Sequence, residues 1–167
     1  MTADLSKAMS RIPDNHDYLP QSGFPAFLDV ARELLFGDLT KDLSPRIASI
    51  QTIAGTGACH VGTELVSKKL KPKNVWIANP TWINHSLMWT VNAPEINQKF
   101  YPYNDASNIA FDFRGFISAL DGADKGDVVI LQACAHNPTG LDPSAEQWTA
   151  IADLFEKKGL VPFFDCA

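Results

Sequence analysis

The sequence lacks any apolar run long enough to span a membrane, and it also lacks any run of basic residues. Its 14 Lys and Arg residues are outnumbered by 19 Asp and Glu residues, which gives a formal net charge of -5. Nucleic acids are polyanions, so this balance argues against them as partners. We therefore expect neither a membrane nor a nucleic acid to bind this chain.

Cysteine is scarce, with only Cys59, Cys134 and Cys166, and no two of them have the CxxC spacing. We interpret them as free, buried thiols in a reducing compartment. The N-terminus shows neither an apolar signal core nor an Arg-rich transit pattern. These features predict a cytoplasmic protein, while mitochondrial residence stays open because the sequence can start downstream of the true N-terminus. The four histidines are scattered, so no metal site is expected.

What the sequence does contain is an alternation of strand and helix patterns, with 46% hydrophobic residues over 167 positions. Strands are expected at 47–53, 75–78, 98–101, 128–131 and 160–164. Helices are expected at 24–35, 61–70, 84–90, 112–120 and 143–158, with Asn84, Asp112 and Asp142 as caps and Gly37 and Gly159 as stops. The alternation predicts an α/β fold, in which a mostly parallel sheet is connected by right-handed crossovers.

The segment 126–140 is central to this prediction. Its apolar run from Val128 to Leu131 is typical of a strand buried on both faces, as in a parallel sheet. The sequence His-Asn-Pro-Thr-Gly at 136–140 then stops the strand and forces a turn. Polar side chains consequently follow the carboxyl end of a central strand, which is where open α/β sheets bind ligands.

Four strand ends each carry a candidate binding group. The Ala54–Ala58 stretch is expected to be a glycine loop before a helix, and its backbone amides together with the Thr56 hydroxyl can hold a phosphate. Trp82 can stack on a ring, and Asn137 can donate to a ligand oxygen. Asp165, which ends an apolar run, can pair with a protonated ring nitrogen. This set suits pyridoxal phosphate better than a nucleotide.

Each of these features also has a purely structural interpretation. The glycines can serve a tight turn, Trp82 can be a half-buried packing residue, and Asn137 and Asp165 can be turn residues. His85 can cap a helix or fill the core. Trp76, Trp89 and Trp148 lie on apolar faces and are expected in the core. It is the combination that favours a cofactor site.

Five segments carry a resemblance to one enzyme family. They are 16–20, 55–58, 79–85, 133–148 and 163–165. The Asn-Pro-Thr-Gly at 137–140 occurs in many aminotransferases. Thr-Trp-x-Asn-His at 81–85 together with His-Asn-Pro-Thr-Gly-x-Asp-Pro at 136–143 narrows the match to the aspartate and aromatic branch. The chain thus resembles the large domain of an aspartate aminotransferase, a fold-type I enzyme that uses pyridoxal phosphate. The resemblance implies a three-layer α/β/α domain, here incomplete.

The resemblance assigns a role to each candidate. Gly55 and Thr56 correspond to residues that bind the cofactor phosphate, and Trp82 to the residue that stacks on the pyridine ring. Asn137 corresponds to the residue that bonds the phenolic oxygen and helps seat the substrate carboxylate. Asp165 corresponds to the residue that keeps the pyridine nitrogen protonated.

Two further residues receive implied roles. His85 resembles a histidine that supports Asp165 from behind. Tyr18 resembles a tyrosine that reaches the phosphate of the neighbouring subunit, which implies a homodimer. On this basis we divide the chain into an N-terminal segment with a cross-subunit loop at 1–22 and a partial cofactor-binding large domain at 23–167.

The chain also departs from the family pattern. Ala54 stands where serine or glycine is common, and Gln132 where histidine is frequent. The family's Schiff-base lysine lies in a motif beyond residue 167, and the lysines present here are all expected to be solvated. We therefore expect no catalytic residue within this chain and interpret it as a fragment of an active aminotransferase.

The implied activity is transamination between L-aspartate and 2-oxoglutarate. Two other hypotheses stay open. One is an inactive, truncated paralogue that acts as a cofactor-binding or interaction module. The other is an unrelated phosphate-binding α/β domain, which would prefer a nucleotide to pyridoxal phosphate.

Overall fold

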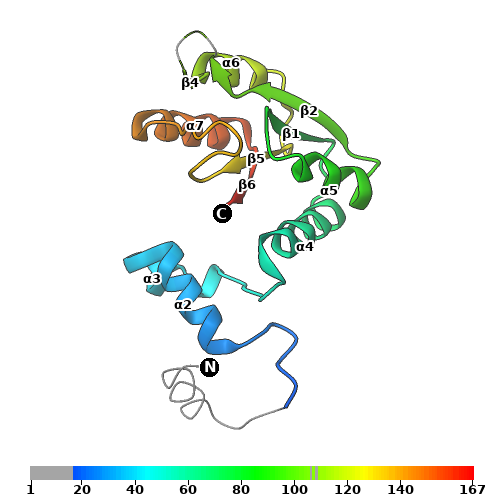
Figure 1. The fold of residues 1–167 in the computed structure, drawn as a ribbon, viewed down its shortest axis with the longest axis vertical. Helices are drawn as coiled ribbons and strands as arrows, with labels where there is room; N and C mark the ends of the chain where they lie inside the picture. Colours follow the sequence, from blue (N-terminus) through cyan, green and yellow to red (C-terminus); the bar gives the residue numbers. More distant parts are fainter. Residues whose placement is uncertain (1–16, 106, 108) are drawn as a thin grey trace, which may run out of the picture. The chain divides into compact units, whose positions relative to one another are not determined.

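The computed structural model describes residues 17–105, 107 and 109–167 (Figure 1). The chain divides into two compact units, Met1–Thr52 and Ile53–Ala167. Most of the expected N-terminal segment 1–22, including His16 of the family motif, lies outside the described residues.

The smaller unit is helical. Its main helix, α2 (Pro25–Phe36), was expected from the apolar spacing and begins with proline in its first turn. Gly37, with φ of 53°, ends it, and its N–H donates to the carbonyl of Glu33. Three short turns follow: η1 (Gly37–Leu39), α3 (Thr40–Leu43) and η2 (Ser44–Arg46).

The prediction of a strand at 47–53 is wrong. Residues 47–52 form no strand, and Gln51 instead ties this segment to the residues before α2. Its N–H donates to the carbonyl of Ser22 at 2.8 Å, and its side-chain oxygen accepts from the N–H of Phe24 at 2.9 Å. Ile50 is 53% exposed. The alternating apolar residues of 47–53 therefore do not pack on a sheet, and an alternating pattern without strand pairing does not produce a strand.

The larger unit contains a four-stranded parallel sheet. Its strands are β1 (Asn74–Asn79), β2 (Asn97–Pro102), β5 (Val128–Gln132) and β6 (Val161–Asp165), in the order β2-β1-β5-β6. All three strand pairs are parallel, as predicted. The register pairs Gln132 with Asp165 at the carboxyl edge of the sheet.

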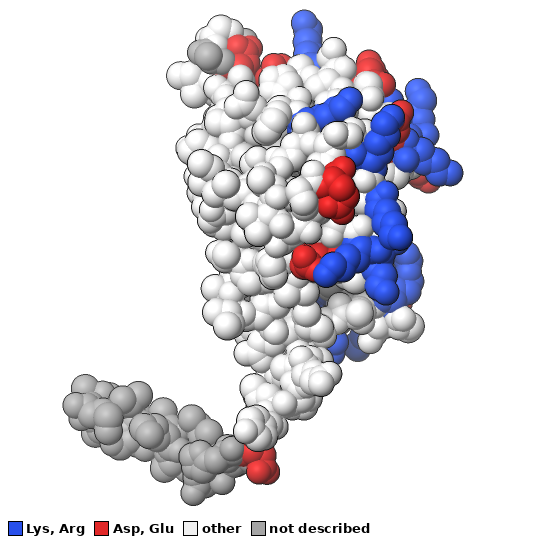
Figure 2. Space-filling model, turned by 90° about the vertical axis from the view of Figure 1, so that its right-hand side faces the viewer, with Lys and Arg blue, Asp and Glu red and all other residues white. Residues whose placement is uncertain are grey.

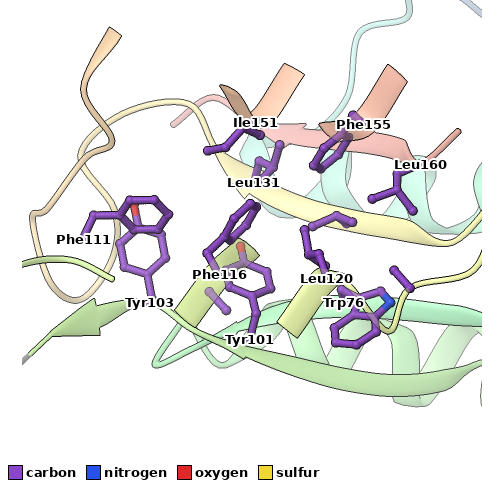
Figure 3. Close-up of a cluster of buried hydrophobic side chains, with 13 residues drawn as sticks. Trp76, Tyr101, Tyr103, Phe111, Phe116, Leu120, Leu131, Ile151, Phe155 and Leu160 are labelled. Atoms are coloured by element: carbon purple, nitrogen blue, oxygen red, sulfur yellow. The ribbon is translucent and has the colours of Figure 1, made fainter. Parts of the chain in front are cut away.

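Helices cover both faces of this sheet. They are α4 (Ala54–Lys69), α5 (Asn84–Asn92), α6 (Phe113–Leu120) and α7 (Ala145–Lys158). On one face, Trp76 and Leu131 pack with Phe116 of α6 and Ile151 of α7 (Figure 3). On the other face lie Val75, Ile77, Val128 and Ile130, packed with Trp89 of α5 and Val66 of α4. Successive strand residues alternate between two cores, which explains the uninterrupted apolar runs and confirms the three-layer α/β/α fold.

The helix ends match the predictions only in part. Asp112 caps α6 by accepting from the N–H of Gly115, and Gly159 ends α7 with φ of 66°, as predicted. The cap predicted at Asp142 is wrong, because α7 starts at Ala145 with Ser144 in a capping box. Asn84 is not a cap either, because it is the first residue of α5 and Ile83 occupies the cap position. The chain already turns before α5, where the N–H of His85 donates to the carbonyl of Trp82.

One small element was not predicted. β3 (Asn104–Asp105) and β4 (Ala110–Phe111) form an antiparallel pair next to α6. With two residues each, they are too short to carry a periodic pattern.

Asp127 lies at the amino edge of the sheet and is completely buried. Its carboxylate accepts from the side-chain amide of Asn74 at 2.9 and 3.0 Å and from the indole N–H of Trp76 at 3.0 Å. The backbone N–H groups of Asn74 and Asp124 donate to it at 3.2 and 3.1 Å. The carboxylate therefore fastens the start of β1 to the start of β5.

Candidate functional site

A pocket of about 270 Å³ opens at the carboxyl edge of the sheet. Five residues that the sequence predicts as ligand contacts line this pocket: Gly55, Thr56, Trp82, Asn137 and Asp165. The predicted ligand contacts of the larger unit therefore lie together. Its other lining residues are Cys59, Gln132, Ala135 and Ala167.

The expected glycine loop at 54–58 is instead the first turn of α4, so the loop prediction is wrong. The N–H of Gly57 already bonds the carbonyl of Ile53 at 3.1 Å, which is a helical bond. Within the described part of the chain, no side chain caps this helix. The N–H groups of Gly55 and Thr56 precede that first bond and have no acceptor within the helix, so they can bind an anion.

Gly55 leaves room beside this helix end. Beyond its neighbours and the backbone of α4, a Cβ atom at this position would meet no atom of the described residues within 4 Å, so packing among them does not demand glycine here. The helix end therefore offers both N–H donors and space, and the residues present fit a phosphate group.

A line of hydrogen bonds runs away from the pocket behind Asp165. Its carboxylate lies 2.9 Å from Nε2 of His85, and Nδ1 of that ring lies 2.8 Å from the hydroxyl of Thr81. His85 is 2% exposed. The bonding pattern assigns the proton to Nε2, which donates to Asp165, while Nδ1 accepts from Thr81. Asp165 is thereby held with its other side turned to the pocket, where a protonated ring nitrogen can pair with it.

Cys59 is a pocket residue that sequence reasoning missed. Burial raises the pKa of its thiol to about 11, assisted by the charge of Asp165 and a hydrogen bond to that carboxylate. The thiol thus stays protonated at neutral pH. Cys59 follows Gly55 by one helical turn, so the correct start of α4 would have placed it on the pocket side.

Trp82 lies directly after β1, partly exposed, with its ring at 90° to that of His85 and the two centroids 5.4 Å apart. Its stacking role stays a prediction. Trp76 and Trp89 are core residues, as predicted, and Trp148 packs partly buried against the same core as Trp76.

The turn after β5 is tightly bonded. The carboxylate of Asp142 accepts from the N–H groups of Ala135 and His136 at 3.0 and 3.3 Å. The His136 ring stacks on Tyr103, with centroids 3.3 Å apart, and its Nδ1 lies 2.9 Å from the Thr139 hydroxyl. Among the described residues, its buried Nε2 has no hydrogen-bond partner.

The environment of His136 keeps this ring neutral. Burial lowers the pKa of His136 to about 4, the nearby His85 contributes in the same direction, and Asp142 opposes the shift. At neutral pH the His136 ring therefore adds no charge to this turn.

Tyr18 belongs to the smaller unit and is fully exposed there. Its cross-subunit role stays a prediction. The expectation of three buried thiols holds only for Cys59, because Cys134 and Cys166 are exposed. Both lie just after the carboxyl ends of β5 and β6.

None of the described residues that line the pocket is a lysine. Lys68, Lys71 and Lys73 instead line a separate surface hollow with Glu95. Figure 2 shows basic side chains gathered on one side of the face in view. In the described part of the chain, no group of three or more His, Cys, Asp or Glu residues could hold a metal ion. No described helix is both long and apolar enough to cross a bilayer.

The parallel sheet has helices on both faces, and an uncapped helix end lies beside a carboxylate at its carboxyl edge. This arrangement defines an α/β domain whose pocket fits a phosphorylated ring. The family profile "Aminotransferase class I and II" matches residues 2–167. The chain therefore belongs to the class I and II aminotransferases, a family of enzymes whose cofactor is pyridoxal phosphate.

Individual relatives support this assignment. The chain is 48% identical over 159 residues to an L-tyrosine:2-oxoglutarate aminotransferase of Aspergillus ustus, covering 91% of this chain and 30% of that protein. It is 42% identical over 154 residues to the aspartate aminotransferase of Escherichia coli, covering 90% and 38%. The chain thus spans about a third of the length of these relatives. Others are named as cytoplasmic and chloroplastic aspartate aminotransferases of Arabidopsis thaliana.

A solved structure gives the same picture. The aromatic-amino-acid aminotransferase of Burkholderia pseudomallei, covalently bound to pyridoxal phosphate, matches with a TM-score of 0.89 and 33% identity. The match covers 98% of this chain and 41% of that one. The aminotransferase fold predicted from the sequence is thereby confirmed.

Proposed function

We propose that this chain is the cofactor-binding part of a pyridoxal-phosphate-dependent aminotransferase, which transfers the amino group of L-aspartate to 2-oxoglutarate. The observation that carries the proposal is the convergence of Gly55, Thr56, Trp82, Asn137 and Asp165 on one pocket. The family membership supports the reaction class.

Each residue has a defined task in this proposal. The N–H groups of Gly55 and Thr56 bind the phosphate, and the Trp82 ring covers one face of the pyridine. The Asn137 side chain donates to the phenolic oxygen and helps seat the substrate carboxylate. Asp165, held by His85, pairs with the ring nitrogen and favours its protonated form. When bound, the cofactor supplies an aldehyde that accepts amino groups and a protonated ring that withdraws electrons.

The amino donor has a second candidate. The relative at 48% identity acts on L-tyrosine with 2-oxoglutarate, which favours an aromatic donor. Purified protein from the source, assayed with 2-oxoglutarate and either L-aspartate or L-tyrosine, separates the two by the ratio of kcat/KM.

The proposal also places this chain within a longer homodimeric protein in the cytoplasm. The longer protein is supported by the coverage of the two aminotransferases, because this chain spans only 30% and 38% of their lengths. The dimer is supported by the resemblance of Tyr18 to a tyrosine that reaches the neighbouring subunit. An intact mass well above 18.3 kDa for the native protein, with peptides past Ala167, is the expected result. A native mass of 18.3 kDa would instead favour the alternative, an inactive cofactor-binding module.

The binding test uses the 167-residue chain and a charge placed at the helix end. Gly55→Asp is expected to abolish binding of pyridoxal phosphate, measured by equilibrium dialysis, because the new carboxylate occupies the phosphate position. An aspartate in the first turn stabilises a helix, so the variant keeps its fold. Gly122→Asp adds the same charge after α6 and should bind normally. Equal binding by both variants, or no binding by the unaltered chain, contradicts the proposal.

A further inference from the structure

Gln132, the last residue of β5, holds the backbone of Asn137 with both ends of its side-chain amide. Its oxygen accepts from the N–H of Asn137 at 2.9 Å, and its nitrogen donates to the carbonyl of the same residue at 3.4 Å. Gln132 is 7% exposed and lines the pocket. The side chain thus connects the end of a rigid central strand to the turn that carries a proposed ligand contact.

The bonding demands a carboxamide of this length. One residue's N–H and C=O require an acceptor and a donor on neighbouring atoms, and only Asn and Gln side chains provide this pair. A carboxylate can only accept, so it would leave the Asn137 carbonyl facing a negative oxygen. An aspartate or asparagine would be one methylene shorter.

Gln132 is also the direct neighbour of Asp165. The two residues are partners in the parallel register of β5 and β6, so their side chains stand on the same face of the sheet. Both amide atoms of Gln132 are engaged with Asn137, and the side chain carries no charge. The carboxylate is therefore held by His85, and its charge stays available to the pocket.

We propose that Gln132 is the positioning residue of this site, one that fixes Asn137 in the pocket and keeps the charge of Asp165 available to a pyridinium ligand. This inference rests on the proposed function, because the ligand it serves is the cofactor named there. It predicts that Gln132 governs both the rigidity of the turn before any ligand binds and the affinity for the cofactor.

The test compares two substitutions with a matched control. Gln132→Leu removes both hydrogen bonds at nearly constant volume, and Gln132→Glu replaces the donor by a charge next to Asp165. Gln98→Leu is the control, because Gln98 in β2 also uses both amide atoms, with Ser86 and Thr90, but does not line the pocket.

The first readout needs no ligand. Amide hydrogen exchange of Asn137, followed by NMR in the 167-residue chain, is expected to accelerate at least tenfold in Gln132→Leu and to stay unchanged in Gln98→Leu. Unchanged exchange in Gln132→Leu would overturn the inference.

The second readout is the dissociation constant of pyridoxal phosphate. We expect it to rise about tenfold in Gln132→Leu and further in Gln132→Glu, with Gln98→Leu unchanged. Equal effects of the Gln132→Leu and Gln98→Leu variants would overturn the inference. If the unaltered chain binds no cofactor, the proposed function falls and takes the cofactor part of this inference with it. The exchange rates alone then decide whether Gln132 holds the turn.

Discussion

Two aspartates at opposite edges of one sheet show how the same side chain serves the fold in one place and a ligand in the other. Asp127 at the amino edge is completely buried and receives five hydrogen bonds from neutral donors. Asp165 at the carboxyl edge has a side chain that is 14% exposed, and it faces the pocket.

The difference lies in how many acceptor positions the protein fills. A carboxylate has about four lone-pair positions, and the donors around Asp127 occupy all of them. Asp165 is bonded by His85 and keeps capacity on the pocket side. A saturated buried carboxylate stabilises the fold, whereas one with remaining capacity can pair with a ligand cation.

The largest expected effect is on the stability of the amino edge. Asp127→Ala leaves the buried donors of Asn74 and Trp76 without an acceptor, and we expect it to lower the free energy of unfolding by about 3–5 kcal/mol. Asp165→Ala should cost less, about 1–2 kcal/mol, because it leaves one buried donor, Nε2 of His85, without its acceptor and the carboxylate itself is partly exposed. Urea denaturation of both variants measures the contrast, and equal losses would show that the two carboxylates do not differ in this way.

For cofactor affinity we expect the opposite order, in which a change at the carboxyl edge has the larger effect. Asp165→Asn replaces a charge-assisted hydrogen bond to the ring nitrogen by a neutral one, at a cost of roughly 2 kcal/mol, or about thirtyfold in the dissociation constant of pyridoxal phosphate. Its unfolding curve should stay close to that of the unaltered chain. Asp124→Asn, on the surface at the amino edge, serves as the control and should bind normally. A change below threefold in Asp165→Asn would rule out a bond between this carboxylate and the cofactor.

A pH effect is expected from His136 at the carboxyl edge. Its pKa is lowered to about 4 in the folded chain from an ordinary 6.5, chiefly by burial. The unfolded chain therefore takes up a proton first as the pH falls, so the stability contributed by the neutral ring is fully present above 6.5 and declines towards 4. His136→Phe keeps a ring against Tyr103 and should show a loss between pH 7 and 5 that is about 2 kcal/mol smaller, or ~6 °C in Tm. Parallel melting curves for the two proteins would contradict this.

How far the sequence predicts such a molecule depends on the range of the interactions. The run Val128–Leu131 predicted a central strand because both faces of that strand are buried, and Trp82, Asn137 and Asp165 were placed at one edge because each follows a strand. These inferences need only local pattern and the rule that parallel strands end together.

The features that were missed depend on distant partners. Asp127 carries no local signal, because Asn74 and Trp76, which donate to it, lie 53 and 51 residues away. Cys59 was missed because the first turn of α4 was interpreted as a loop. The strand expected at 47–53 failed for the opposite reason, since a suitable local pattern found no pairing partner.

The smallest expected effect tests whether the hydrogen bonds behind Asp165 act as a unit. Thr81→Val keeps the shape but removes the hydroxyl that bonds Nδ1 of His85. That ring then no longer has its proton fixed on Nε2, so its bond to Asp165 weakens. We expect the dissociation constant of pyridoxal phosphate to rise about twofold to threefold, or ~0.5 kcal/mol, without a change in fold. Thr149→Val is the matched control, because that hydroxyl bonds only a carbonyl within α7. Identical binding by the two variants would mean that His85 keeps Asp165 in place without Thr81, and the contrast between the two edges would then rest on the carboxylates and their direct partners alone.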